Sequence, residues 1–317
     1  MNTIKIIKNR SDIGAGTRGS DMGIDAIEIA AINQNNDFFN RHAFEDVETH
    51  NETIYNKNTN TFAKRIEHVV EQCERVSKSV SKNLTRGFFP IVLSGDHSSA
   101  LGTISGIKAA HPNKTLGVVW IDAHADIHSP YTSPSGNIHG MPLAAAMGID
   151  NLTCQVNTPG EITTNHWDRL KNIGTNGPKL KPDHLVYFGV RDFEEAEQVA
   201  ISQNNIRLIK VEELRFRGLA VCVKEAIDKL LGCDLIYISF DVDSMDCDNI
   251  SYGTGTPVPY GLLPNEVMQI ITSLLATNKV CCIEFTEINP LLDNKGNKMA
   301  ETAFQVLNHI AEQIPLV

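Results

Sequence analysis

The chain has 317 residues, of which 42% are hydrophobic, so it can bury the core of one large α/β domain or of two ordinary ones. Its 38 acidic and 28 basic residues give a net charge of −10, which disfavours binding to nucleic acid or to an anionic membrane and suits a small cationic substrate. We expect a cytoplasmic protein with reduced thiols, because no signal peptide or membrane-length apolar run is found and the seven cysteines form no C-x-x-C pair.

Strand-like apolar runs alternate with helical patterns along the chain. In chain order, the sequence predicts a helix at 21–32, a strand at 88–94, a helix at 98–110, strands at 115–121 and 184–190, a helix at 193–204, a strand at 206–211, a helix at 218–231, a strand at 234–240, a helix at 263–276, a strand at 280–285 and a helix at 298–314. The strands are almost continuously hydrophobic, which is typical of a parallel sheet that helices cover on both faces.

Two polar stretches interrupt the alternation, at 33–60 and 150–183. Their content of Asn, Thr, Gly and Pro predicts long surface connections rather than domain boundaries, because the alternation resumes after each. We therefore expect one α/β domain over residues 1–317.

Acids and imidazoles gather where three predicted strands end. They are Asp122, His124 and Asp126 in one segment, Asp241 and Asp243 in another, and His97, preceded by Asp96, in a third. Alternate residues of a strand point to the same side, and ligands of open parallel sheets bind beyond the carboxyl ends of the strands. These side chains are therefore expected to converge.

Burying four carboxylates together without compensation would be prohibitive. Two divalent cations that share a carboxylate remove this objection. Oxygen-rich ligation with two imidazoles favours Mn²⁺, with Fe²⁺, Co²⁺ or Ni²⁺ as alternatives, and favours Zn²⁺ less. A two-metal site generates hydroxide near neutral pH and indicates hydrolysis. A single D-x-H-x-D segment could be a surface salt-bridge motif, but four of the 11 histidines (97, 124, 128 and 139) fall in one short span.

The segment "GAGTRG" at 14–19 matches the dinucleotide-binding pattern G-x-G-x-x-G. That motif requires an apolar strand directly before the glycines, and here the polar segment "KNRSD" intervenes. We interpret it as a glycine-rich turn before a helix.

Several longer motifs resemble the arginase–agmatinase (ureohydrolase) superfamily over nearly the whole chain. They are "SGDHSSALG", "DAHAD", "SGNIHG", "SFDVD", "GTGTPVPYGL" and "EINP". The resemblance implies a single three-layer α/β/α domain with a mostly parallel sheet and two Mn²⁺ ions per chain. It implies one metal held by His97, Asp122, Asp126 and Asp241, and another held by His124, Asp122, Asp241 and Asp243.

The segment "SPYTSPSGNIHG" resembles arginases more than other ureohydrolases. The resemblance implies that Ser135 and Asn137 bind a substrate α-carboxylate, that Glu194 contacts the α-ammonium group, and that Thr256 lies near the metals. It also implies that His139 is the proton shuttle and that Glu287 pairs with the guanidinium. Asp126, one of the implied metal ligands, is expected to be catalytic as well. The implied reaction is hydrolysis of L-arginine to L-ornithine and urea, in a homo-oligomer such as a trimer or hexamer.

Some residues depart from the arginase pattern. His128 stands where many arginases carry an Asn that touches the carboxylate, and Glu194 replaces a shorter Asp. Cys247 stands in the place of a usual proline, and the segment is one residue longer than in some relatives, which makes the alignment between Asp243 and Thr254 ambiguous. These departures keep open a ureohydrolase that acts on agmatine or another guanidino compound. A non-catalytic metal-binding scaffold is the alternative from a different class.

Overall fold

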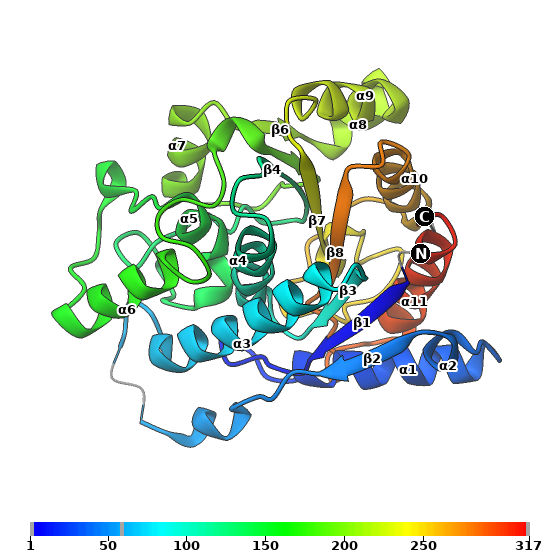
Figure 1. Ribbon diagram of the computed structural model, residues 1–317, viewed down its shortest axis with the longest axis horizontal. Helices are drawn as coiled ribbons and strands as arrows, with labels where there is room; N and C mark the ends of the chain where they lie inside the picture. The colour runs from blue at the N-terminus through cyan, green and yellow to red at the C-terminus, as the bar shows by residue number, and fades with distance from the viewer. Residues whose placement is uncertain (1–2, 58–59, 315–317) are drawn as a thin grey trace.

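An eight-stranded, wholly parallel sheet organises the computed structural model, which describes residues 3–57 and 60–314 (Figure 1). The strands are β1 (Ile4–Asn9), β2 (Ala43–Asp46), β3 (Phe89–Ser94), β4 (Leu116–Ile121), β5 (Leu185–Phe188), β6 (Arg207–Ile209), β7 (Leu235–Asp241) and β8 (Val280–Thr286). Their order in the sheet is β2-β1-β3-β8-β7-β4-β5-β6. The predicted parallel sheet is therefore confirmed.

Helices cover both faces of the sheet, as the continuous hydrophobicity of the strands requires. They are α1 (Gly23–Asn33), α2 (Phe38–Arg41), α3 (Ile66–Thr85), α4 (Ala100–Ala110), α5 (Pro142–Met147), α6 (Glu161–Lys171), α7 (Glu195–Gln203), α8 (Val211–Arg217), α9 (Leu219–Lys229), α10 (Pro264–Leu275) and α11 (Lys298–Ala311). Trp120 of β4 packs in the core with α3 to α7, whereas its neighbour Ile121 packs in the core with α1 and α8 to α11. This alternation produces three layers, α/β/α.

Several elements were not predicted. Strand β1 continues through Lys8 and Asn9, so part of the "KNRSD" segment is strand rather than loop. The stretch 33–60 is not only a surface connection, because it contains α2 and the edge strand β2; likewise 150–183 contains α6. Strand β2 escapes prediction because an edge strand with mostly exposed side chains carries no apolar run. Residues 58 and 59 of the first stretch lie outside the described residues.

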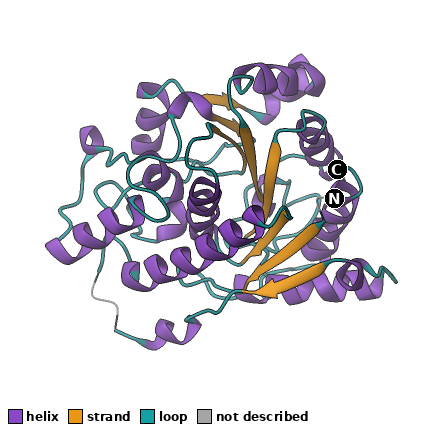
Figure 2. Cartoon of the chain, viewed as in Figure 1, coloured by secondary structure: helices purple, strands orange, loops and turns teal. Residues whose placement is uncertain are grey.

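The middle of the sheet positions the candidate site. Strand β8 lies between β3 and β7, and β4 lies on the other side of β7 (Figure 2). Because all these strands are parallel, the segments that follow β3, β4, β7 and β8 emerge at one edge. Within the described ranges, no helix is long and apolar enough to cross a membrane. All seven cysteines are free, as expected from the sequence.

Candidate active site

Short carboxylate-capped turns hold the predicted ligands where the strands end. Asp122 Oδ1 accepts a hydrogen bond from the His124 amide at 2.7 Å, and Asp241 Oδ1 accepts one from the Asp243 amide at 2.8 Å. A carboxylate that bonds the amide two residues later bends the chain sharply. Each bend keeps the alternate residues at the sheet edge, where the sequence predicted them.

The first ligand group surrounds His97, the first residue of a short 3₁₀ turn after β3. The Nδ1 atom of His97 lies 3.0 Å from Asp122 Oδ2, 3.0 Å from Asp126 Oδ2 and 3.1 Å from Asp241 Oδ2. These are the four residues predicted for one metal.

The second group surrounds His124. Its Nδ1 atom lies 3.0 Å from Asp243 Oδ2 and 3.6 Å from Asp122 Oδ1. Asp122 therefore contributes one oxygen to each group, as a bridging carboxylate would. The Oδ2 atom of Asp241 lies on the His97 side, while its Oδ1 accepts from a backbone amide, so bridging by Asp241 stays a prediction.

The hydrogen bonds around His97 show that this donor set fits a metal. Its Nε2 atom lies 2.7 Å from the Ser239 hydroxyl, and its ring stacks on Trp120 with the centroids 4.1 Å apart. The buried Nδ1 atom has no hydrogen-bond partner within the described part of the chain, although three carboxylates surround it. A ring held through Nε2 presents the Nδ1 lone pair to that centre, which is the usual arrangement of a metal-ligating histidine.

Burial shifts the pKa values of these carboxylates in different directions. Burial and the nearby charge of Asp122 raise the pKa of Asp126 to about 6. Burial, then Asp243 and Asp122, raise the pKa of Asp241 well above its ordinary value. Burial would also raise the pKa of Asp122, but His124 and His97 lower it below its usual range. The metal-free site thus concentrates negative charge that divalent cations would neutralise.

His139 and Glu287 form an ion pair beside these groups. His139 Nδ1 lies 3.1 Å from Glu287 Oε1, which also accepts a hydrogen bond from the His97 amide at 2.9 Å. The other oxygen of Glu287, Oε2, accepts no hydrogen bond from any described residue, although Glu287 lines the cavity. That oxygen is free to receive a donor from a ligand in the cavity.

We expect the metal-free protein to lose stability as the pH rises from about 6.5 to about 9. Burial alone would lower the pKa of His139, but Glu287 raises it from 6.5 to about 9. Between these values the folded protein keeps a proton that the unfolded chain has released, so the stabilisation is complete below pH 6.5 and lost above pH 9. Urea denaturation in the presence of a chelator should show a loss of roughly 1–3 kcal/mol. An equally steep loss in His139→Asn would contradict this assignment.

The predicted substrate-binding residues lie on one cavity of about 290 Å³. It is lined by every predicted site residue except Asp122, which lies buried beneath it: His97, His124, Asp126, His128, Ser135, Asn137, His139, Glu194, Asp241, Asp243, Thr256 and Glu287. Thr256 donates to Asp243 Oδ2 at 3.1 Å, which ties the "GTGTP" segment to the second ligand group. The segment after Asp243, whose alignment with the family is ambiguous, thus folds back to the cavity.

Two of the site residues have unusual backbone conformations. Asp126 has a φ of 51° and Glu287 a φ of 66°, in the left-handed region that residues other than glycine rarely occupy. Such strain costs on the order of 1–3 kcal/mol and persists where the surroundings hold the residue in place, commonly at functional sites.

His128 and Glu194 lie together at one end of the cavity. His128 Nε2 lies 3.0 Å from Glu194 Oε2, and its Nδ1 lies 3.0 Å from the Thr132 hydroxyl. His128, and secondarily the Glu197 side chain, lower the pKa of Glu194 to about 2. Both ring nitrogens of His128 are therefore engaged by the protein itself.

Sequence reasoning missed Glu197 and Asp192, which line the cavity, and Lys64, which contacts the cavity residue Asn137. Glu197 is buried, lines the cavity and forms a capping box with Glu194 at the start of α7. The E-x-x-E spacing could have indicated it. Lys64 Nζ lies 3.2 Å from Asn137 Oδ1, close to the predicted carboxylate-binding end. No local motif marks Lys64, because it reaches the site from a segment 73 residues away.

The glycine-rich segment at 14–19 packs against the site. It forms turns and bends before α1, as predicted. The Gly14 amide donates to Asp96 Oδ2 at 2.9 Å, and the Gly14 carbonyl accepts from the His139 amide at 3.2 Å. A side chain at Gly14 would collide with Ser98 and Asp96, so glycine is required by this close approach.

A parallel sheet with two groups of candidate metal ligands at its carboxyl edge is an arrangement that metal-dependent hydrolases use. The sequence model of the arginase family matches residues 2–312. The chain belongs to the arginase family and is a hydrolase.

Individual relatives agree over nearly the full chain. Arginase from Bacillus subtilis (strain 168) is 34% identical over 310 residues, which cover 97% of each protein. The native crystal structure of arginase from Bacillus caldovelox has a TM-score of 0.84 at 33% identity and covers 98% of each chain. The crystal structure of Entamoeba histolytica arginase in complex with L-ornithine has a TM-score of 0.82 at 26% identity, covering 98% of this chain and 97% of that chain.

Proposed function

We propose that this protein hydrolyses L-arginine to L-ornithine and urea, with two Mn²⁺ ions held by the two ligand groups. The observation that carries the proposal is the pair of ligand groups sharing Asp122, with Glu287 on the same cavity. The Entamoeba histolytica relative, described as a complex with L-ornithine, supports the identity of the product. Bound divalent cations would supply hydroxide near neutral pH.

Glu287 is proposed to orient the guanidinium group. Its Oε1 atom is held by His139 and by the His97 amide, which leaves Oε2 for a substrate N–H. A carboxylate and a planar cation form strong charge-assisted hydrogen bonds. Because Glu287 is buried and its amide donates to the Gly95 carbonyl, the target carbon would be held in one place relative to the two ligand groups.

His139 is proposed to deliver the proton to the departing amine. Its raised pKa of about 9 keeps the imidazole protonated at neutral pH in the metal-free protein. The ring lines the cavity, so a proton held at His139 can reach the leaving group.

The outer end of the cavity is proposed to bind the amino-acid part of the substrate. Ser135 and Asn137 offer hydroxyl and amide donors to the α-carboxylate, and the nearby Lys64 ammonium adds a positive charge. Glu194 supplies the negative group for the α-ammonium. This division matches a zwitterionic substrate better than agmatine, which lacks the carboxylate.

The first experiment measures urea release after preincubation with Mn²⁺, with L-arginine and agmatine in parallel and an EDTA-treated control. We expect turnover of L-arginine that depends on metal and exceeds turnover of agmatine. A preference for agmatine would contradict the proposed substrate but not the hydrolytic chemistry. A metal-loaded protein that releases urea from neither compound would contradict the function.

His128→Asn is expected to raise the preference for L-arginine over agmatine about tenfold, the size of one hydrogen bond to a charged group. In the present protein His128 is engaged by Glu194 and Thr132, so it offers no free donor to a carboxylate. An asparagine would release Glu194 and supply an amide donor. The measurement is kcat/KM for both compounds, with His166→Asn on α6 as control; an unchanged ratio would contradict the argument.

A further inference from the structure

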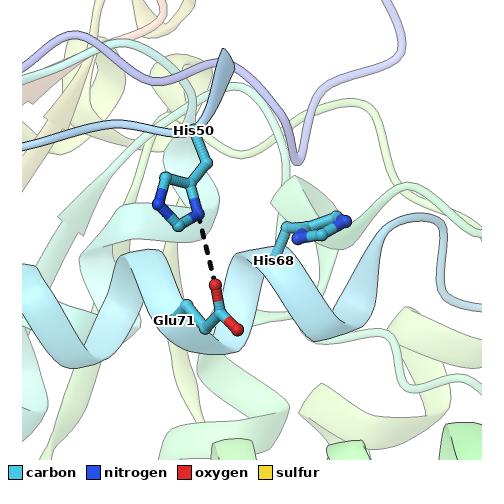
Figure 3. A group of neighbouring side chains, drawn as sticks. All are labelled: His50, His68 and Glu71. Atoms are coloured by element: carbon cyan, nitrogen blue, oxygen red, sulfur yellow. Dashed lines mark ion pairs between the residues drawn. The ribbon is translucent and has the colours of Figure 1, made fainter. Parts of the chain in front are cut away.

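We propose a second type of metal site, distant in sequence from the ligand groups above, formed by His50, His68 and Glu71 (Figure 3). One ligand atom from each residue lies within 4.8 Å of the other two. The ligand set, two imidazoles and one carboxylate, suits Zn²⁺ and similar late transition-metal ions. It would not favour Mn²⁺, which binds such nitrogen ligands most weakly of the first-row divalent series.

Two elements bring the three residues together. His68 and Glu71 are three residues apart on α3 and therefore share one side of that helix (Figure 3). His50 comes from the connection after β2 and faces Glu71, with its Nδ1 atom 3.2 Å from Glu71 Oε2, whereas the His68 ring points away from this pair (Figure 3). Two of the three ligand atoms are thus already about as close as they would be around a tetrahedral ion with bonds of about 2.0–2.2 Å.

The surroundings of His68 also favour a bound ion. Its Nδ1 atom is buried and has no hydrogen-bond partner among the described residues. A buried polar atom without a partner is unfavourable by about 1–3 kcal/mol and calls for an explanation such as an ion. The His68 side chain as a whole is only partly buried, so its ring can rotate. Such a rotation can bring the His68 ligand atom to about 3.5 Å from the ligand atoms of His50 and Glu71.

Arg75 opposes metal binding in the present arrangement. Its guanidinium, one turn further along α3, contacts His50 Nε2, and Arg75 also donates to the Glu48 carbonyl at 3.0 Å. A guanidinium donates only, so it holds the His50 proton on Nδ1, the atom that faces Glu71. Metal binding requires Nδ1 to lose that proton and Arg75 to turn away. We therefore infer a site whose affinity is limited by Arg75.

The ion would fasten the connection 47–50 to α3. Gln72 already donates to the Glu48 carbonyl at 3.2 Å, so the ion would reinforce a contact that the protein makes. Helix α3 begins directly after Lys64 and Arg65. Arg65 donates to the Ala15 carbonyl of the glycine-rich segment and to the carbonyl of Ile13 just before it. The proposed role is therefore structural.

The test is the number of metal ions bound per chain when the Mn²⁺-loaded protein is dialysed against Zn²⁺ and analysed for total metal. Because Zn²⁺ can also enter the first two ligand groups, the informative quantity is the difference between variants. We expect the unmodified protein to bind about one ion more per chain than His68→Ala or Glu71→Gln. The control His166→Ala, which removes another partly buried helical histidine, should bind as many ions as the unmodified protein.

Two further readouts separate this site from a merely structural cluster. Zn²⁺ should raise the unfolding midpoint of the unmodified protein about 2–5 °C more than that of Glu71→Gln, a partly exposed position where loss of folding is not expected. Arg75→Gln should tighten the additional Zn²⁺ site about tenfold, because it removes the competing donor and its charge. Equal metal counts in all variants, or weaker binding in Arg75→Gln, would overturn the proposal.

Discussion

Asp241→Asn is expected to abolish metal-dependent urea release and, in the metal-free protein, to increase the free energy of unfolding. Asp241 lies 3.1 Å from His97 and is proposed as a ligand, so its loss should reduce kcat/KM by at least about 10³-fold. Without metal, burial and then Asp243 and Asp122 raise the pKa of Asp241 well above its ordinary value. The proton that Asp241 keeps in the folded protein therefore stabilises the fold fully below the ordinary pKa of aspartate. This stabilisation is lost as the pH rises through the raised pKa.

An asparagine side chain has no such penalty and can still accept the Asp243 amide hydrogen bond. At pH 8 the metal-free variant should therefore be more stable than the metal-free parent by roughly 1–3 kcal/mol, whereas in Mn²⁺ the order should reverse. Denaturation curves recorded with Mn²⁺ and with EDTA measure the free energy of unfolding with and without metal. Asp246→Asn is the matched control, since Asp246 is also buried but accepts hydrogen bonds from backbone amides instead of facing His97. Lower stability of Asp241→Asn in both conditions would show a structural role.

Glu287→Gln is expected to lower kcat/KM for L-arginine by about 10²–10⁴-fold. Glutamine keeps the size of the side chain and can accept from the His97 amide, but it loses the charge that would hold the guanidinium. It also removes the partner that raises the pKa of His139, so this pKa should fall from about 9 towards 6.5.

Steady-state kinetics and an NMR titration of His139 in the metal-free variant measure these two effects separately. Both KM and kcat should change, because the carboxylate would act in binding and in orientation. Glu301→Gln, on the outer helix α11, controls for the loss of one negative charge. An unshifted His139 with normal kinetics would remove Glu287 from the proposed machinery.

Much of the candidate site could be predicted, because the end of a buried strand can be recognised from the residues next to it in the sequence. The apolar run was enough to place Asp122, His124 and Asp126 just beyond the carboxyl end of β4, although a bend after Ile121, rather than a continued strand, positions their side chains. The rule that parallel strands end at one edge then joined them to His97 and Asp241. In the structure His97, His124, Asp126 and Asp241 line one cavity, and Asp122 lies buried beside His97 and His124. Their roles as metal ligands stay predictions.

The parts that could not be predicted depend on tertiary contacts or on weak local patterns. Lys64 reaches Asn137 from a distant segment, and nothing in its own neighbourhood marks it. Strand β2 is recognised only by its pairing with β1, since its side chains are mostly exposed. Helix α3 is different, because the spacing of Val69, Val76 and Val80 carries a helical period that could have indicated it.

The position of β8 has a consequence for the order in which the protein matures during synthesis. In the described sheet, β8 is the strand that joins β3 to β7, although it is the last of the eight to leave the ribosome. Until it inserts, the half that carries His97 and the half that carries Asp122 and Asp241 have no strand pairing between them. The first ligand group is therefore completed only when nearly the whole polypeptide has been made. The second ligand group, whose residues follow β4 and β7, does not depend on this last step, because these two strands pair directly.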